Sequence, residues 1–160
     1  MARKKIILEL EEYPGIEQLS DPDRRLLNEA KIALQLAYAP YSGFNVGVAL
    51  RTVSGAVVRG ANLENAAYPM CLCGERTALA AAASQYPNEA VEAMAITVKH
   101  RHKTITEPAG PCGACRQVIS ETEDRFQHPV RIILQGETGG VVCVDSVKVL
   151  LPLYFTGAFL

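Results

Sequence analysis

The sequence has no excess of either charge. Its 16 Lys and Arg residues are balanced by 17 Asp and Glu residues, and the formal net charge is −1. Without a strong positive field, the chain is not expected to bind nucleic acid or an anionic membrane surface. A small, weakly charged ligand fits this composition better.

Long apolar runs are also missing. Ile6, Ile7 and Leu8 follow three basic residues, but Glu9 ends this run far short of the roughly 20 residues that a membrane span needs. We therefore expect neither a signal peptide nor a membrane helix, and a cytoplasmic location. The sequence contains no internal repeat, and 160 residues of which 49% are hydrophobic suit one globular domain. We expect this domain to cover residues 20–160, after an N-terminal extension at residues 1–19.

The five cysteines do not have the spacing of a secreted disulfide scaffold, and their number is odd. Cys143 lies in the apolar run 141–144, so we expect a buried, inert thiol there. The remaining four cysteines are clustered. In a reducing compartment such clusters are typical of metal ligands.

Hydrophobic periodicity predicts an α/β fold. A capped helix should run from Ser20 to Pro40, and period-two segments on either side of Ser54 and Gly55 predict a hairpin that ends near Asn62. Alternating helices and strands then follow, which favours a mixed five-stranded sheet with helices on both faces. The later predicted elements are a helix at 74–86, a strand at 93–98, a helix at 113–123, a strand at 130–134, a turn at 136–140, one more short strand and a terminal helix.

Two cysteine motifs predict a zinc site. Cys73 is followed two residues later by Glu75, and Cys112 and Cys115 form a C-x-x-C pair. Three thiolates leave the fourth position of a zinc ion open, and a carboxylate beside it can move protons, as in the zinc deaminases of cytosine and adenine. Both motifs start predicted helices, whose dipoles favour thiolates. The alternative is a closed structural site in which Cys71 is the fourth ligand.

Five motifs, spread from about Ala30 to Phe155, closely resemble those of the small tetrameric cytidine deaminases. The resemblance implies a cytidine-deaminase-like α/β/α sandwich and one Zn²⁺ per chain. It further implies conversion of cytidine and 2′-deoxycytidine to uridine and 2′-deoxyuridine with release of ammonia, in pyrimidine salvage. The motifs are residues 41–47, 62–69, 73–78, 111–117 and 150–152.

The resemblance also assigns roles to single residues. Zinc is expected on Cys73, Cys112 and Cys115, with Glu75 as the proton shuttle. The nucleoside is expected to meet Asn62 and Glu64 at its ribose hydroxyls, with Phe44 packed against it and with Tyr68 and Gly74 close by. Phe155 is expected to reach into the site of a neighbouring subunit of a homotetramer. Plain core roles for Phe44 and Tyr68, and burial of Phe155 within its own chain, are the alternatives.

Two arginines directly follow the cysteine motifs. We expect Arg76 or Arg116, or both, to donate hydrogen bonds to the thiolates and to offset their charge. About five residues more than the family pattern has lie between the strand at 93–98 and Pro111, and the polar segment His100–Glu107 is expected to be solvated. The competing functions are deamination of another cytosine-bearing nucleoside, such as an antibiotic, and a non-catalytic zinc module.

Overall fold

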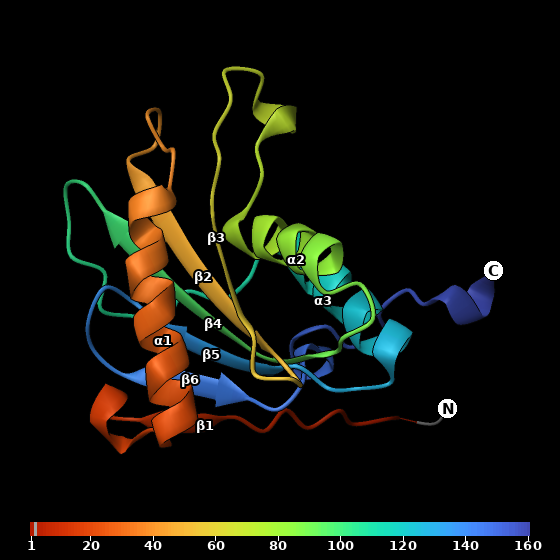
Figure 1. The fold of residues 1–160 in the computed structure, drawn as a ribbon. Coiled ribbons are helices and arrows are strands. Elements are labelled where there is room, and N and C mark those ends of the chain that lie inside the picture. The colour runs from red at the N-terminus through yellow and green to blue at the C-terminus, as the bar shows by residue number, and fades with distance from the viewer. Residues whose placement is uncertain (2) are drawn as a thin grey trace.

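A six-stranded mixed sheet forms the centre of the molecule (Figure 1). The computed structural model describes residue 1 and residues 3–160. The strand order is β1-β6-β5-β4-β2-β3, in which β4 and β5 are parallel and all other neighbours are antiparallel. The strands are β1 (Glu11–Tyr13), β2 (Phe44–Thr52), β3 (Val57–Ala61), β4 (Val91–His100), β5 (Arg131–Gln135) and β6 (Val141–Val144).

Helices cover both faces of this sheet, as the alternating pattern predicts. α1 (Asp21–Ala33) packs on one face, and α2 (Gly74–Gln85) and α3 (Gly113–Phe126) pack on the other (Figure 1). Side chains alternate along the strands, so Ala49 and Ala95 face α1, whereas Val48 and Ile96 face α2 and α3. The sheet thus separates two hydrophobic cores, one on each face.

The predicted first helix is shorter than expected. Its capping signal is confirmed, because Ser20 Oγ accepts a hydrogen bond from the backbone N–H of Asp23 at 3.4 Å. However, the α-helix ends at Ala33, and a single 3₁₀ turn (Leu34–Leu36) follows it before Pro40. The hairpin of β2 and β3 and the helices at the two cysteine motifs are confirmed.

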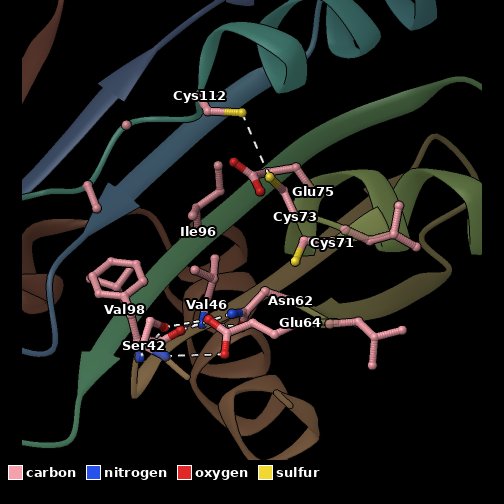
Figure 2. Close-up of a pocket in the computed structure, with 15 residues that line it drawn as sticks. Ser42, Val46, Asn62, Glu64, Cys71, Cys73, Glu75, Ile96, Val98 and Cys112 are labelled. Carbon is pink, nitrogen blue, oxygen red and sulfur yellow. Dashed lines mark hydrogen bonds between the residues drawn. The ribbon is translucent and has the colours of Figure 1, made fainter. Parts of the chain in front are cut away.

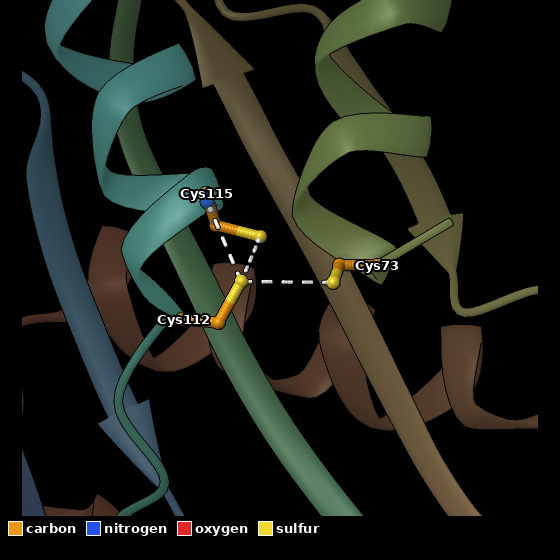
Figure 3. Close-up of side chains that lie close together, drawn as sticks. All are labelled: Cys73, Cys112 and Cys115. Atoms are coloured by element: carbon orange, nitrogen blue, oxygen red, sulfur yellow. Dashed lines mark hydrogen bonds between the residues drawn. The ribbon is translucent and has the colours of Figure 1, made fainter. Parts of the chain in front are cut away.

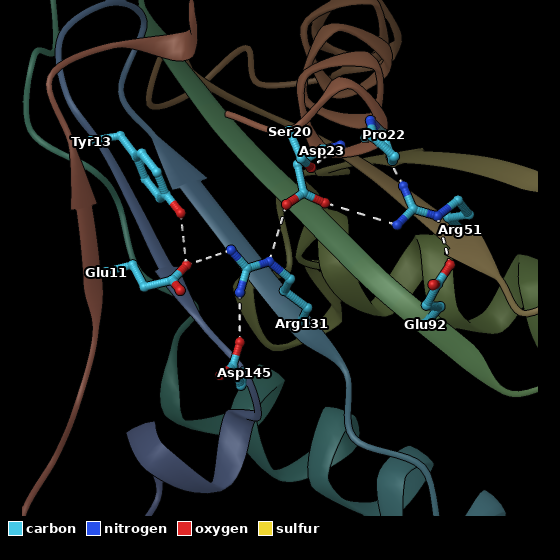
Figure 4. A network of polar contacts seen from close by, with 9 residues as sticks. All are labelled: Glu11, Tyr13, Ser20, Pro22, Asp23, Arg51, Glu92, Arg131 and Asp145. Atoms are coloured by element: carbon cyan, nitrogen blue, oxygen red, sulfur yellow. Dashed lines mark hydrogen bonds and ion pairs between the residues drawn. The ribbon is translucent and has the colours of Figure 1, made fainter. Parts of the chain in front are cut away.

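The expectation of five strands is wrong, because the N-terminal segment adds a sixth. β1 pairs antiparallel with β6, and Arg131 on β5 connects it to the rest of the fold (Figure 4). The Arg131 guanidinium donates to Glu11 at 2.5 Å, to Asp23 at 3.1 Å and to Asp145 at 2.5 Å. Hydrophobic alternation could not reveal β1, because this strand has only three residues and two of them are glutamates.

The expectation of a terminal helix is also wrong. Within the described residues, the chain after β6 contains two 3₁₀ turns, Val147–Leu150 and Gly157–Phe159, and no α-helix. Pro152 explains the break, since the residue before a proline is disfavoured in the helical conformation, and Leu151 has φ −138° and ψ 68°. Leu153 then turns the chain with a positive φ of 59°.

The topology brings two helix N-termini to the same edge of the sheet. β3 and β4 both pair antiparallel with β2, so they run in the same direction. α2 connects β3 to β4, and α3 connects β4 to the parallel strand β5. Both helices therefore begin where parallel-running strands end, which is where ligands bind in open α/β sheets. In the described part of the chain, no helix has the length and apolar character needed to cross a membrane.

Candidate metal centre and substrate cavity

Three cysteines converge at this edge of the sheet (Figure 3). Cys73 is the N-cap residue of α2, and Cys112 is that of α3, with Cys115 one turn further along. Their Sγ atoms lie within 4.8 Å of one another, with Cys73 and Cys112 3.8 Å apart and Cys112 and Cys115 3.3 Å apart. Residues 39 positions apart in the sequence thus form one group of sulfur donors.

The donor set fits zinc. Three thiolates bound about 2.3 Å from a tetrahedral zinc ion would lie about 3.8 Å from one another. The Cys73–Cys112 separation equals this value, and the Cys112–Cys115 separation of 3.3 Å is somewhat shorter. Burial raises the pKa of the Cys73 and Cys115 thiols, so these neighbouring acids ionise readily only beside a cation. Zinc is therefore the cofactor that this group suits.

Cys71 lies outside the sulfur cluster. Its sulfur accepts a hydrogen bond from the Asn65 backbone N–H at 3.3 Å and lies 3.6 Å from the Asn65 carbonyl oxygen. The cluster thus has three protein ligands and not four, which argues against a closed structural site. An open coordination position is the property that a catalytic zinc site requires.

Glu75 stands beside the cluster in the first turn of α2. Its side chain is only 5% exposed, although glutamate is rarely buried without a partner. Burial raises the pKa of this carboxyl group, and hydrogen bonds from its own backbone N–H and from the Cys115 thiol offset part of this effect. A raised pKa makes a carboxyl group a better proton acceptor, which suits a group that has to act as a general base and then as a general acid.

A cavity of about 500 Å³ extends from the sulfur cluster along the edge of the sheet. Figure 2 shows Cys73, Glu75 and Cys112 at one end of this cavity and Ser42 and Glu64 at the other. Its lining is mostly apolar, with polar groups at the two ends. A cavity of this size suits a small organic ligand with polar groups at both ends.

Asn62 lines the cavity and also holds β2 in place. Its Oδ1 accepts a hydrogen bond from Val46 N–H at 2.8 Å, and its Nδ2 donates to the Phe44 carbonyl at 2.9 Å. An amide group has two donors and two acceptor lone pairs, so one of each remains for a ligand. The side chain can therefore support the strand and contact a ligand together.

Glu64 is fixed by the turn that precedes β2. Its carboxylate accepts hydrogen bonds from Tyr41 N–H at 2.9 Å, from Ser42 N–H at 3.3 Å and from Ser42 Oγ at 2.5 Å. The Ser42 hydroxyl, together with these backbone amides, lowers the pKa of Glu64. The result is an ionised and oriented acceptor at the end of the cavity opposite the cluster of Cys73, Cys112 and Cys115.

The aromatic candidates separate into two groups. Phe44 lines the cavity, as expected. Tyr68 is 70% exposed and lies beside a neighbouring hollow, where its ring packs edge-on against Tyr41 with centroids 6.1 Å apart. Phe155 is 58% exposed and lines no part of its own chain's cavity. Its ring lies against Phe159 instead.

Gly74 lies with its Cα close to the sheet, so a side chain at this position would point toward β2 and not into the cavity. A Cβ there would lie 3.0 Å from Val48 Cγ2 and 3.3 Å from the Val46 carbonyl oxygen. The absence of a side chain therefore allows α2 to start close to β2. Through this close approach Gly74 positions Cys73 and Glu75, its two neighbours in the sequence.

The two arginines have other partners than the expected thiolates. Arg76 Nη2 donates to the Cys71 carbonyl at 2.9 Å, and its Nε is buried without a hydrogen-bond partner. Arg116 donates to the carbonyls of Pro111 and Leu150, both at 2.8 Å. These arginines hold the segments that carry the cysteines. The position of each arginine directly after a cysteine motif does not predict that its guanidinium binds backbone carbonyls.

Ser42 and the apolar wall of the cavity were not predicted from the sequence as parts of the site. Ile96 and Val98 line this wall from β4, and Ala109 and Gly110 line it from the segment before α3. Alternation along β4 predicts which residues share a face of the sheet. It does not predict that the cavity lies against Ile96 and Val98. For Ser42 the available signal was its place directly before Gly43 in a turn motif.

Comparison with known proteins agrees with this site. Residues 20–127 match the family described as the cytidine and deoxycytidylate deaminase zinc-binding region. The cytidine deaminase of Halalkalibacterium halodurans is 47% identical over 135 residues, which cover 84% of this chain and 95% of that protein. A crystal structure of the Burkholderia pseudomallei cytidine deaminase is 41% identical, with a TM-score of 0.71, and covers 82% of this chain and 97% of that one.

A cytidine deaminase structure from Mycobacterium tuberculosis shares 28% identity and a TM-score of 0.65, over 86% of this chain and 98% of that one. The family match covers more than half of the chain and contains all three clustered cysteines. The chain therefore belongs to the cytidine and deoxycytidylate deaminase family, whose zinc-binding region it contains.

Proposed function

We propose that this protein hydrolyses cytidine and 2′-deoxycytidine to uridine and 2′-deoxyuridine, with release of ammonia. The observation that carries the proposal is the convergence of three cysteine thiols and a buried glutamate at one end of a cavity of about 500 Å³. The cytosine ring would enter with its amino group toward the cysteines. The sugar would lie at the end that carries Asn62 and Glu64.

Cys73, Cys112 and Cys115 would hold the zinc ion. When bound, zinc supplies a Lewis acid that makes water nucleophilic near neutral pH. Three thiolates bring a negative charge into a partly buried place, and Arg76 and Arg116 place two cations close behind them. We assign these two arginines the role of bracing the ligand segments.

Glu75 would move the protons of the reaction. It takes a proton from the attacking water, delivers it to N3 of the cytosine and then assists protonation of the departing ammonia. Its burial limits contact with bulk water and raises its pKa, which makes it a better proton acceptor. Water thereby replaces the amino group at C4, and the ring becomes that of uridine.

Recognition of the sugar would rest on the far end of the cavity. The ionised Glu64 accepts a hydrogen bond from a ribose hydroxyl, the free N–H of Asn62 donates one, and Phe44 packs against the nucleoside. Glu64 would repel a phosphate placed at the same point. This favours nucleosides over polynucleotides.

The test is the loss of cytidine absorbance with purified protein, read beside a zinc determination. Glu75→Gln should keep zinc and fold but lose about 10²–10⁴-fold or more in turnover, because the shuttle is gone. Glu89→Gln is a matched control, since Glu89 is a half-buried glutamate that lies just after the C-terminal end of α2, accepts a hydrogen bond from Ser54 and does not line the cavity. Near-parental deamination by Glu75→Gln would end this assignment.

We further propose a homotetramer in which Phe155 completes the site of a neighbouring subunit. Support comes from its exposure and from its absence from its own chain's cavity. If Phe155→Ala is impaired, mixing it with Glu75→Ala under conditions of subunit exchange should give more activity than the two samples separately. Exchange shown by mass spectrometry without such a gain would refute the shared site.

A further inference from the structure

The segment between β4 and α3 is mostly exposed over His100–Glu107, as expected, but it is attached to the rest of the fold at several points. Its middle is attached to the turn after β5, because Ile105 O accepts a hydrogen bond from Glu137 N–H at 2.7 Å. Its end lines the cavity through Ala109 and Gly110. Its beginning, at Arg101, lies at the sugar end.

Arg101 packs directly over the turn that precedes β2. Its backbone N–H donates to Gly43 O at 2.9 Å. Gly43 has a positive φ of 67°, and Arg101 Cβ lies 3.1 Å from the place where a Cβ of Gly43 would be. The guanidinium Nε and Cζ lie 3.6 and 3.8 Å from that same point, so the side chain folds back over the turn.

This turn carries the groups that would meet the sugar. Tyr41 and Ser42 bind the Glu64 carboxylate, and Phe44 follows Gly43 directly. His100, the neighbour of Arg101, is paired with Phe44 across the sheet, and the two rings meet edge-on with centroids 6.3 Å apart. The end of β4 therefore supports the sugar end from outside.

Building on the proposed cytidine deamination, we propose that Arg101 is a positioning residue for sugar recognition: its side chain clamps the turn at Gly43 and so orients Glu64 toward the ribose hydroxyls. The Arg101 charge also contributes to the lowered pKa of Glu64, after the hydrogen bonds from Ser42 and Tyr41. The clamp is specific to the side chain beyond Cβ, because the backbone hydrogen bond survives any substitution except proline.

The test compares kcat and KM for cytidine and 3′-deoxycytidine. Arg101→Ala should raise KM for cytidine on the order of tenfold with kcat within about twofold, as expected for the loss of binding that is equal in ground and transition states. The advantage of cytidine over 3′-deoxycytidine should shrink by a similar factor. Lys103→Ala, which removes an exposed cation two residues away, is the control and should behave as the parent.

A double-mutant cycle with Glu64→Gln tests whether Arg101 acts on sugar recognition through Glu64. If Arg101 acts through Glu64, adding Arg101→Ala to Glu64→Gln should cost less than about twofold, because interacting residues are not additive. Arg101→Gln keeps most of the packing and removes the charge, so an intermediate KM would show that both parts of the side chain contribute. Thermal unfolding of each variant separates this effect from a loss of fold.

Three results would overturn the inference: Arg101→Ala indistinguishable from Lys103→Ala, a fall in kcat with unchanged KM, or full additivity with Glu64→Gln. A parent protein that does not deaminate cytidine would instead refute the proposed function, and the inference with it. An active parent with any of the three results would refute the inference alone.

Discussion

Replacing Asn62 by alanine should lower stability as well as activity. The Asn62 amide makes two hydrogen bonds to the backbone of β2, at 2.8 Å to Val46 N–H and at 2.9 Å to Phe44 O, and both are partly buried. Each such bond stabilises a protein by about 1 kcal/mol, and a buried group left unpaired costs about 1–3 kcal/mol. We therefore expect a loss of about 2–4 kcal/mol in the free energy of unfolding.

Differential scanning fluorimetry would measure this loss. For a chain of this length, each kcal/mol lowers Tm by roughly 2–4 °C, so Asn62→Ala should melt roughly 4–16 °C below the parent. Asn65→Ala is the matched control, because Asn65 Oδ1 caps only the exposed Ala67 N–H at 2.8 Å. That variant should stay within about 3 °C.

Equal melting temperatures for the two asparagine variants would refute the reasoning, because they would show that the amide of Asn62 does not hold β2. The sugar role is tested separately. If Asn62 also contacts a ribose hydroxyl, its alanine variant should discriminate less between cytidine and 3′-deoxycytidine than Asn65→Ala does, at a temperature where both are folded.

Three further predictions concern other parts of the chain. Cys71→Ser should retain about one zinc per chain by plasma mass spectrometry whereas Cys115→Ser loses it, and loss of zinc from both would restore the closed-site alternative. Hydrogen bonding by Arg131 lowers the pKa of Glu11, so the contribution of the Glu11 carboxylate to stability is present above about pH 5 and is lost as pH falls through the folded pKa. Glu11→Gln should therefore unfold at lower urea concentration than the parent at pH 7 but at the same concentration in strong acid. A difference that does not change with pH would contradict this. Burial raises the pKa of Cys143 to about 11, so Cys143→Ser should leave the number of thiols titrated in the folded protein at pH 8 unchanged, and one thiol fewer would show that Cys143 is accessible.

Motifs and periodicity were sufficient for the parts of the fold that local sequence determines. Gly74–Gln85 is rich in alanine and starts at Cys73, and the helix is found there. The C-x-x-C spacing fixes Cys112 and Cys115 one turn apart on any helix. That Cys73 joins them follows from topology, since it depends on β3 and β4 running in the same direction.

The failure to predict β1 has a physical cause, because this strand depends on contacts between distant segments. β1 exists because residues 11–13 find the free edge of β6 and because Arg131 meets Glu11 120 residues away in the sequence. No local pattern encodes this partner. The terminal helix is the opposite case, because the local sequence already argued against it: Pro152 disfavours a helix at the residue before it.

The arginines show why residue type alone could not complete the site. A guanidinium has five donors, and near a thiolate cluster both sulfur and carbonyl oxygen can accept them. The structure shows Arg116 bound to the carbonyls of Pro111 and Leu150, which connects the start of α3 to the segment after β6. Phe155 follows Leu150 by only five residues, and Gln117 Nε2 on α3 donates a hydrogen bond to the Phe155 carbonyl at 2.9 Å. α3 therefore positions both the Cys112–Cys115 pair and the exposed ring of Phe155. A substitution at Arg116 should therefore disturb both the cysteine cluster and the position of Phe155, whose contact with a neighbouring subunit is proposed above, and neither motif shows this coupling when it is considered alone.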